Sequence, residues 1–241
     1  MNMKTDCNEL YGREKVNNTD IEVLASIVSS VTGKGLAAMT AQAMMDEFGD
    51  LGRILAADSK ELRRGGNTPV EVIAEIERLK YLLRTILYRN MHQRPLLEDL
   101  SSVEIYYRAK LFDKKKEQLH VLYLDSGFEL LSAECVQIGT VDHVAVYPRE
   151  IMALAIENSA KHLILVHNHP SAAPEPCAAD IVMTNELITA CSFFGIHVAD
   201  HLIVSRDDSF SFREAGLMNT PQVTIPRGKT SQQQTPVSEN V

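Results

Sequence analysis

His167 and His169 stand one residue apart at the end of a short apolar run, LILV at 163–166. Side chains alternate between the two faces of an extended strand, so both imidazoles are expected on the same side of the backbone. Asp180 follows a proline-containing segment, in what we predict to be the first turn of a helix. Two imidazoles and one carboxylate, with a coordination position left for water, are typical of a catalytic zinc site rather than a closed structural one.

Cys177 stands where the N-cap residue of this predicted helix belongs, and Asp180 is three residues further on. A carboxylate at that position can reach back to the N-cap backbone, and it suits the positive end of the helix dipole. Capping and metal ligation by Asp180 are compatible, because the first turn presents its carboxylate outward. Cysteine is not a preferred N-cap residue, so the thiol at this position requires a further explanation.

A metal-dependent hydrolase also needs a general base that takes a proton from the bound water and returns it to the leaving group. Glu117 stands just before LHVLYLD (119–125), a predicted strand rich in β-branched and aromatic residues. Composition alone does not separate it from six other glutamates: Glu104, Glu129, Glu134, Glu150, Glu157 and Glu175. Among the other histidines, only His201, which follows Asp200, is a candidate for supporting a metal ligand from behind.

The composition is that of a globular protein, with 241 residues, 45% hydrophobic and 23% charged. A net charge of −8 is not the electrostatic footprint of a protein that depends on phosphate contacts. No apolar run approaches the ~20 residues that a membrane span needs, and the N-terminus has no signal-peptide pattern. The four cysteines form no CxxC pair. These features predict a cytoplasmic protein with reduced thiols and no membrane segment.

Residues 20–90 carry apolar side chains at helical spacing, which predicts a small helical bundle. Helices are expected at about 20–33, 36–48, 51–55 and 68–87, with a short turn at 59–62. The polar segment 1–19 is predicted to be disordered. The bundle is interpreted either as a packing module or as a nucleic-acid-binding one. Basic residues are scattered over the bundle, a distribution more typical of solvated helix faces than of a DNA-binding surface. These residues are Arg63, Arg64, Lys80, Arg84 and Arg89.

After a linker predicted at 91–100, residues 101–218 alternate between strand-like and helix-like segments. This alternation predicts an α/β or α+β domain. Strands are expected at 119–125, 129–140, 163–167, 196–205 and 210–212, and helices at about 101–109, 148–159 and 178–194. Segment 219–241, rich in Ser, Thr, Gln and Pro, is predicted to be a disordered tail.

The segment HNHPSAAPEPCAAD (167–180) closely resembles HNHPSGDPxPSxxD, the signature of RadC-like proteins in the JAMM/MPN metallopeptidase superfamily. The resemblance covers about 101–218, and it includes YPREIM (147–152) and ADHLIVSRDDSFSFREAGLM (199–218). It implies an α+β fold: a helical bundle that resembles a degenerate helix-hairpin-helix module, then a cytidine-deaminase-like JAMM/MPN domain with a mixed sheet.

The resemblance also implies roles for the candidate site residues. His167, His169 and Asp180 would bind Zn²⁺, and Glu117, within KKEQLHVLYLD (115–125), matches the glutamate of the superfamily pattern. The implied reaction is hydrolysis of a peptide or isopeptide bond in a protein or peptide substrate, with Glu117 activating the zinc-bound water.

The chain departs from the superfamily pattern at Cys177, where the resemblance expects a serine. That serine hydroxyl is held to stabilise the developing oxyanion, a contribution of roughly 3–4 kcal/mol in other hydrolases. A thiol donates hydrogen bonds poorly, so we expect a slow or altered enzyme. The alternative is that a thiolate at this position ligates the zinc.

A second departure lies in the helical bundle. RadC-like N-terminal regions resemble helix-hairpin-helix modules, whose glycine-rich hairpin offers backbone amides to a phosphate. The matching segment, RRGGNTPVEV (63–72), keeps Gly65 and Gly66 but little else of the hairpin pattern. The alternative function is therefore a RadC-like, DNA-repair-related protein. It would bind DNA weakly through the helical bundle, and its JAMM site would be structural or weakly active.

Overall fold

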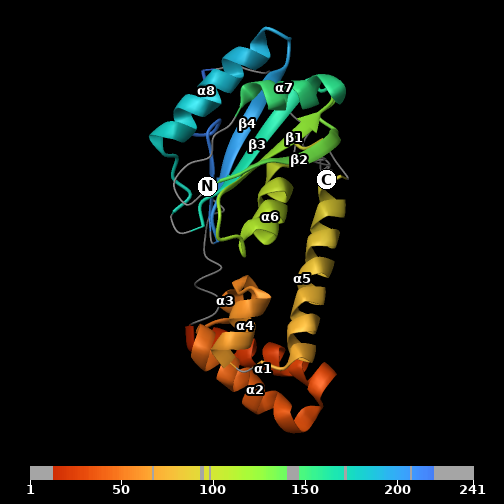
Figure 1. Ribbon diagram of the computed structural model, residues 1–241, viewed down its shortest axis with the longest axis vertical. Coiled ribbons are helices and arrows are strands. Elements are labelled where there is room, and N and C mark those ends of the chain that lie inside the picture. Colours follow the sequence, from red (N-terminus) through yellow and green to blue (C-terminus); the bar gives the residue numbers. More distant parts are fainter. Residues whose placement is uncertain are drawn as a thin grey trace, which may run out of the picture.

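The computed structural model describes residues 13–66, 68–92, 95–97, 99–139, 147–170, 173–206 and 208–219. The described chain forms two parts, a helical module built from α1 to α5 and a sheet domain that runs from α6 to β5 (Figure 1). The long helix α5 (Val70–Met91) extends from the helical module to the side of the sheet domain (Figure 1). No described helix has the length and apolar character needed to cross a membrane.

The helical module packs α1 (Arg13–Thr32), α2 (Lys34–Phe48), α3 (Leu51–Ala56), α4 (Ser59–Gly66) and α5 around one apolar core. Leu24, Val28, Met44, Ile54 and Ile76 are all fully buried there. Gly33 ends α1 with a φ of 79°, a conformation that suits glycine. The predicted helical bundle is confirmed in this part of the chain.

Two boundaries in the module differ from the prediction. Helix α1 begins at Arg13, so residues 13–19 are helical rather than disordered, while residues 1–12 lie outside the described part. Helix α4 continues to Gly66, where only a turn at 59–62 was expected. Neither extension carries apolar residues at helical spacing, so the sequence pattern did not indicate these helical turns.

The described sheet contains five strands in the order β2-β1-β3-β4-β5. The strands are β1 (Gln118–Leu124), β2 (Leu130–Ile138), β3 (His162–Asn168), β4 (His197–Val204) and β5 (Ser209–Ser211). Strands β3 and β4 are parallel and all other neighbours are antiparallel, which confirms the expected mixed sheet. Residues 140–146, which follow β2, lie outside the described part.

Helices cover both faces of the sheet. Helix α6 (Leu100–Leu111) packs on one face, and α7 (Pro148–Glu157) and α8 (Ala178–Ser192) pack on the other. Alternate residues of β1 divide between the two cores, with Val121 and Tyr123 on the α7/α8 side and Leu122 and Leu124 on the α6 side. Strands buried on both faces explain why the sequence shows continuous apolar runs rather than alternation.

The predicted linker takes part in this packing. Leu96 and Leu97 are buried in the core beside α6, and the Leu96 N–H donates to the Phe128 carbonyl at 2.9 Å. Described residues 95–97 therefore belong to the sheet domain. Residues 220–241, most of the predicted tail, lie outside the described part.

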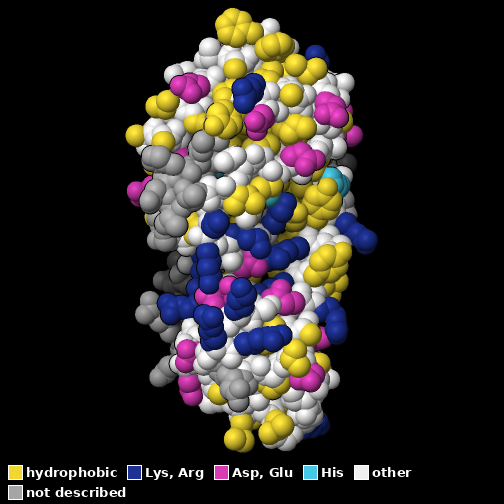
Figure 2. Space-filling model, viewed as in Figure 1, with side chains coloured by type: hydrophobic (Ala, Val, Ile, Leu, Met, Phe, Trp, Pro, Cys, Tyr) yellow, Lys and Arg dark blue, Asp and Glu magenta, His cyan; other side chains and the backbone are white. Residues whose placement is uncertain are grey.

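Ion pairs join the helical module to the sheet domain, where Figure 2 shows Lys and Arg side chains gathered across the middle of one face. Arg206, after β4, contacts Asp50 at 2.6 Å. Lys115 contacts Glu61 at 2.6 Å. On α5, Arg84 donates to the Ala109 carbonyl at 2.9 Å and to Asp113 at 2.7 Å. The contact between the two parts therefore combines these polar contacts with the packing of α5 on α6, where Met91 is buried in the core beside α6.

Replacing Arg84 by Met should lower the free energy of unfolding by about 1–2 kcal/mol, because it removes two partly buried hydrogen bonds. Thermal unfolding of the full chain measures the change. The control is Arg78→Met, which removes an ion pair with Glu75 whose arginine is 71% exposed. That change should stay within about 0.5 kcal/mol. Equal losses in the two variants would contradict the assigned role of Arg84.

The pH dependence gives a second check on this contact. Burial alone would raise the pKa of Asp113, but hydrogen bonds from Arg84 and Lys114 outweigh it and leave the pKa lowered. A lowered folded pKa contributes stability above the unfolded pKa of about 3.9, and that contribution is lost as the pH falls through the folded value. The stability difference between wild type and Arg84→Met should therefore narrow below about pH 4.

Candidate metal centre

Three elements bring the predicted site residues together. His167 is the penultimate residue of β3, and His169 follows that strand directly. Asp180 lies in the first turn of α8. Strand β1 pairs antiparallel with β3 so that Leu119 lies opposite His167, and continuing this register places Glu117 opposite His169. Strand pairing is thus what brings a residue so distant in sequence to the histidines.

The side chains of these four residues converge. The Nδ1 atom of His167 lies 3.6 Å from Oδ1 of Asp180, and Nε2 of His169 lies 3.5 Å from Oδ2 of Asp180. Glu117, His167 and His169 each offer one ligand atom, and these atoms all lie within 4.8 Å of one another. The arrangement combines nitrogen and oxygen donors of the kind that zinc prefers.

His167 supplies a direct test of whether a metal ion fits. Its side chain is buried, and neither ring nitrogen has a hydrogen-bond partner among the described residues. A buried polar atom without a partner costs about 1–3 kcal/mol, so a native structure rarely leaves one unexplained. Burial lowers the pKa of His167 to about 4, which keeps the imidazole neutral, as metal ligation requires. The residues present therefore fit a metal ion.

Asp180 is held in its ionised form. Burial would raise its pKa, but the hydrogen bonds from His169 and Cys177 contribute to lowering it below its usual value. In return, the contact with Asp180 raises the pKa of His169. The carboxylate is therefore available as an anionic ligand between the two imidazoles.

Cys177 caps α8. Its sulfur accepts the Asp180 N–H at 3.4 Å, and its own N–H donates to Oδ2 of Asp180 at 2.8 Å, which completes a capping box. These contacts supply the explanation that the unusual N-cap required. Burial and the neighbouring Asp180 raise the pKa of the thiol, which favours its protonated form. Its role toward an oxyanion stays a prediction.

Behind the ligands lies a buried contact that sequence reasoning missed. The hydroxyl of Thr184 donates to the Asp180 carbonyl at 2.6 Å and lies 2.7 Å from Nδ1 of His201. A hydroxyl has one proton to donate, so Nδ1 of His201 must be the donor in the second contact. The only signal in the sequence was a threonine one helical turn after Asp180.

His201 lies next to the site, as expected of a supporting residue, but it acts by packing. Its ring stacks on His167 with centroids 5.7 Å apart and on Phe212 at 4.5 Å. Its hydrogen bond goes to Thr184 and not to a ligand side chain. Two of the competing glutamates have partners elsewhere, since Glu104 accepts from Ser209 and Glu134 from Ser132.

Comparison with known proteins agrees with this geometry. A family model described as "RadC-like JAB domain" matches residues 97–217. The chain belongs to the RadC-like JAB-domain family. The family resemblance and the JAB/MPN fold expected from it are thereby confirmed. The matched range begins at Leu97, which agrees with the packing of that residue in the sheet domain.

Curated relatives match the chain over most of its length. A UPF0758 protein of Rhodobacter capsulatus is 34% identical over 199 residues, covering 83% of this chain and 93% of the relative. A UPF0758 protein of Methylibium petroleiphilum is 34% identical over 211 residues, covering 87% and 95%. One of Ruegeria pomeroyi is 35% identical over 178 residues, covering 74% and 80%. The similarity therefore extends into the helical module.

In this RadC-like chain, Gly65 has a packing role. It lies in α4 against α2, where an added Cβ would stand 2.9 Å from Cγ of Glu47 and 3.0 Å from Cζ of Phe48. The glycine therefore permits two helices to approach closely. The described neighbours of Gly65 are protein side chains. This residue therefore does not support the expectation that a glycine-rich hairpin at 63–72 binds a phosphate.

Replacing Cys177 by Ser should raise the free energy of unfolding by about 0.5–1 kcal/mol, because serine is a preferred N-cap residue and cysteine is not. Cys177→Ala should instead lower it, since the sulfur acceptor for the Asp180 N–H is removed. Thermal unfolding of the metal-free protein measures both changes. A Ser variant less stable than the Ala variant would contradict the capping role. Unchanged zinc content and hydrolytic activity in the Ser variant would reject a chemical role for the thiol.

Replacing Thr184 by Val keeps the side-chain shape but leaves the buried Nδ1–H of His201 without its acceptor. We expect a loss of about 1–3 kcal/mol in the free energy of unfolding, measured by denaturant titration. The matched control is Thr189→Val on the same helix, whose exposed hydroxyl contacts only the Asn185 carbonyl. The control should change little, and similar losses at both positions would refute a special role for Thr184.

Proposed function

We propose that this protein is a zinc-dependent hydrolase of peptide or isopeptide bonds. The observation that carries the proposal is the meeting of Glu117, His167, His169 and Asp180, with both ring nitrogens of His167 buried and without a hydrogen-bond partner among the described residues. Membership of the RadC-like JAB-domain family supports the same reaction class.

Each residue takes a role that follows from its position. His167, His169 and Asp180 would hold the zinc ion. When bound, zinc supplies Lewis-acid chemistry, polarising a carbonyl and lowering the pKa of a water molecule. Glu117 would be the general base that accepts a proton and passes it to the leaving amine, because its carboxylate reaches the same small volume as the histidines. Cys177 stands at the positive end of α8, where it would face the developing oxyanion.

The alternative, association with DNA through the helical module, has weaker support. The observation in its favour is the group of Lys and Arg side chains across the middle of one face in Figure 2, here called the basic belt. Four cations of the described chain contact carboxylates: Arg53 and Arg206 with Asp50, Lys114 with Asp113, and Lys115 with Glu61. Charges already neutralised within the protein contribute little to binding phosphates. The belt is better explained as the contact between the two parts of the chain.

Zinc binding is the first test of the proposal. The purified full chain should bind about one zinc ion, and zinc at one hundred times its dissociation constant should stabilise the fold by about 2.7 kcal/mol. His169→Ala should lose most of the bound zinc and the added stability. His197→Ala is the control, because His197 is exposed at the start of β4, the opposite end of the sheet from the site. A wild-type protein that neither contains zinc nor is stabilised by it would refute the proposal.

Hydrolysis by the zinc-loaded protein is the second readout. A library of fluorogenic peptides identifies a sequence that the wild type cleaves, and Glu117→Gln is then compared on that peptide. The variant should keep its zinc but lose about 10²- to 10⁴-fold in kcat, since it cannot accept the proton. Full activity in Glu117→Gln would show that another residue is the base.

A further inference from the structure

We propose that Asn168, the residue between the two histidines, positions Glu117 for catalysis. The inference rests on the proposed function, and it assigns a task to the middle residue of the HxH motif. Asn168 does not reach the reacting atoms in this assignment. It acts as a positioning residue through the backbone on either side of Glu117.

The side-chain amide of Asn168 makes two hydrogen bonds. Its Oδ1 accepts the N–H of Gln118 at 2.8 Å, and its Nδ2 donates to the carbonyl of Lys116 at 3.3 Å. These two backbone groups belong to the residues immediately before and after Glu117. The side chain of Asn168 is buried, with 3% of its surface exposed. A single amide therefore fixes the backbone on both sides of Glu117.

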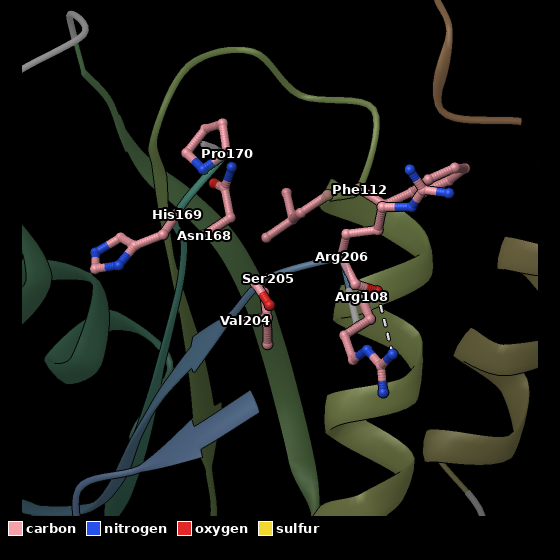
Figure 3. Close-up of a pocket in the computed structure, with 9 residues that line it drawn as sticks. Arg108, Phe112, Asn168, His169, Pro170, Val204, Ser205 and Arg206 are labelled. Carbon is pink, nitrogen blue, oxygen red and sulfur yellow. Dashed lines mark hydrogen bonds between the residues drawn. The ribbon is translucent and has the colours of Figure 1, made fainter. Parts of the chain in front are cut away.

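Strand alternation explains how one tripeptide serves two tasks. His167 continues the series Leu163 and Leu165, which faces α7 and α8, whereas Asn168 continues Ile164 and Val166, which faces α6. Figure 3 shows the amide of Asn168 and the ring of His169 pointing in different directions from the end of the strand. Asn168 also lines a small cavity beside Arg108 and Phe112 on the α6 side.

The segment around Glu117 needs this contact because the strand ladder stops short of it. The pairing between β1 and β3 extends only as far as Leu119, which lies opposite His167. On the β2 side, the Glu117 carbonyl accepts the N–H of Gly139 at 2.8 Å. On the β3 side, the amide of Asn168 takes the place of the next ladder bonds. Glu117 is thus held from both neighbouring strands, at the same strand end that carries the metal ligands.

The consequence for catalysis is a fixed distance between the base and the ligands. A displacement of about 1 Å in a catalytic group can cost on the order of 10²-fold in rate. Because Asn168 is covalently joined to both histidines, any shift of the ligands moves the clamp on Glu117 with them. No other residue type of this size offers one donor and one acceptor in this fork, so the site requires asparagine.

Two variants at Asn168 test its hydrogen bonds to Gln118 and Lys116, and a third variant is the control. Asn168→Ala removes both hydrogen bonds. Asn168→Asp keeps an acceptor for Gln118 but loses the donor to Lys116, and it serves if the alanine variant does not fold. The control is Asn185→Ala, since Asn185 on α8 also uses both ends of its amide, donating to the Ile181 carbonyl and accepting the N–H of Asn219.

The first measurement needs no activity. Amide hydrogen exchange at Gln118, followed by NMR in the full chain, should accelerate by at least about tenfold in Asn168→Ala. It should stay near the wild-type rate in Asn168→Asp and in Asn185→Ala. Unchanged exchange at Gln118 in Asn168→Ala would overturn the proposal.

The second measurement is a double-mutant cycle with Glu117→Gln on the peptide that the wild type cleaves. Asn168→Ala and Asn168→Asp should each lower kcat by about 10²-fold while KM and zinc content stay unchanged. In the Glu117→Gln background they should add no further loss, because their effect passes through Glu117. Losses that multiply would overturn the positioning role. If the wild type hydrolyses no peptide, the proposed function fails, and the exchange measurement still decides whether Asn168 holds this segment.

Discussion

The antiparallel pairing of β1 with β3 is the constraint on which the rest of this site depends. Its register sets Leu119 opposite His167 and so brings the segment that carries Glu117 beside His167 and His169. A shift of one residue would turn every side chain of β1 to the other face of the sheet. Such a shift is prevented because both faces of β1 are buried, Val121 and Tyr123 against α7 and α8, Leu122 and Leu124 against α6. Packing of the core thus fixes the strand register that brings Glu117 close to His167 and His169.

A series of hydrogen bonds links the polar groups around the first turn of α8. Asp180 accepts from Cys177, its carbonyl accepts from Thr184, and Thr184 accepts from His201. Each group satisfies the next, so the first turn of α8 is held before any ligand arrives. The ring of His167, in contrast, is buried, and neither of its nitrogens has a hydrogen-bond partner among the described residues, although Nδ1 lies 3.6 Å from Oδ1 of Asp180. A metal ion bound at this position would supply the partner that these two nitrogens lack.

The helical module is joined to the sheet domain through ion pairs and through α5 rather than through one continuous core. Its own core, around Leu24 and Met44, is separate from the two cores of the sheet domain. Partly exposed ion pairs contribute little stability individually, so the contact depends on several acting together. Of the basic residues considered for a nucleic-acid surface in the sequence, Arg84 has a structural task at this contact, where it bonds Asp113 and the Ala109 carbonyl.

Much of the molecule was determined by the sequence alone. The apolar spacing of α2 and α5, the strand-like run before His167 and the signature shared with RadC-like proteins predicted the bundle, the mixed sheet and the four site residues. The helical turns at 13–19 and 63–66 were not predicted, because neither segment carries apolar residues at helical spacing. Only the tertiary structure decided how a cysteine caps α8 and what Thr184 and Asn168 contact. Those answers depend on hydrogen bonds between segments distant in sequence, such as Asn168 with Lys116 and Gln118, and local spacing carries no information about such contacts.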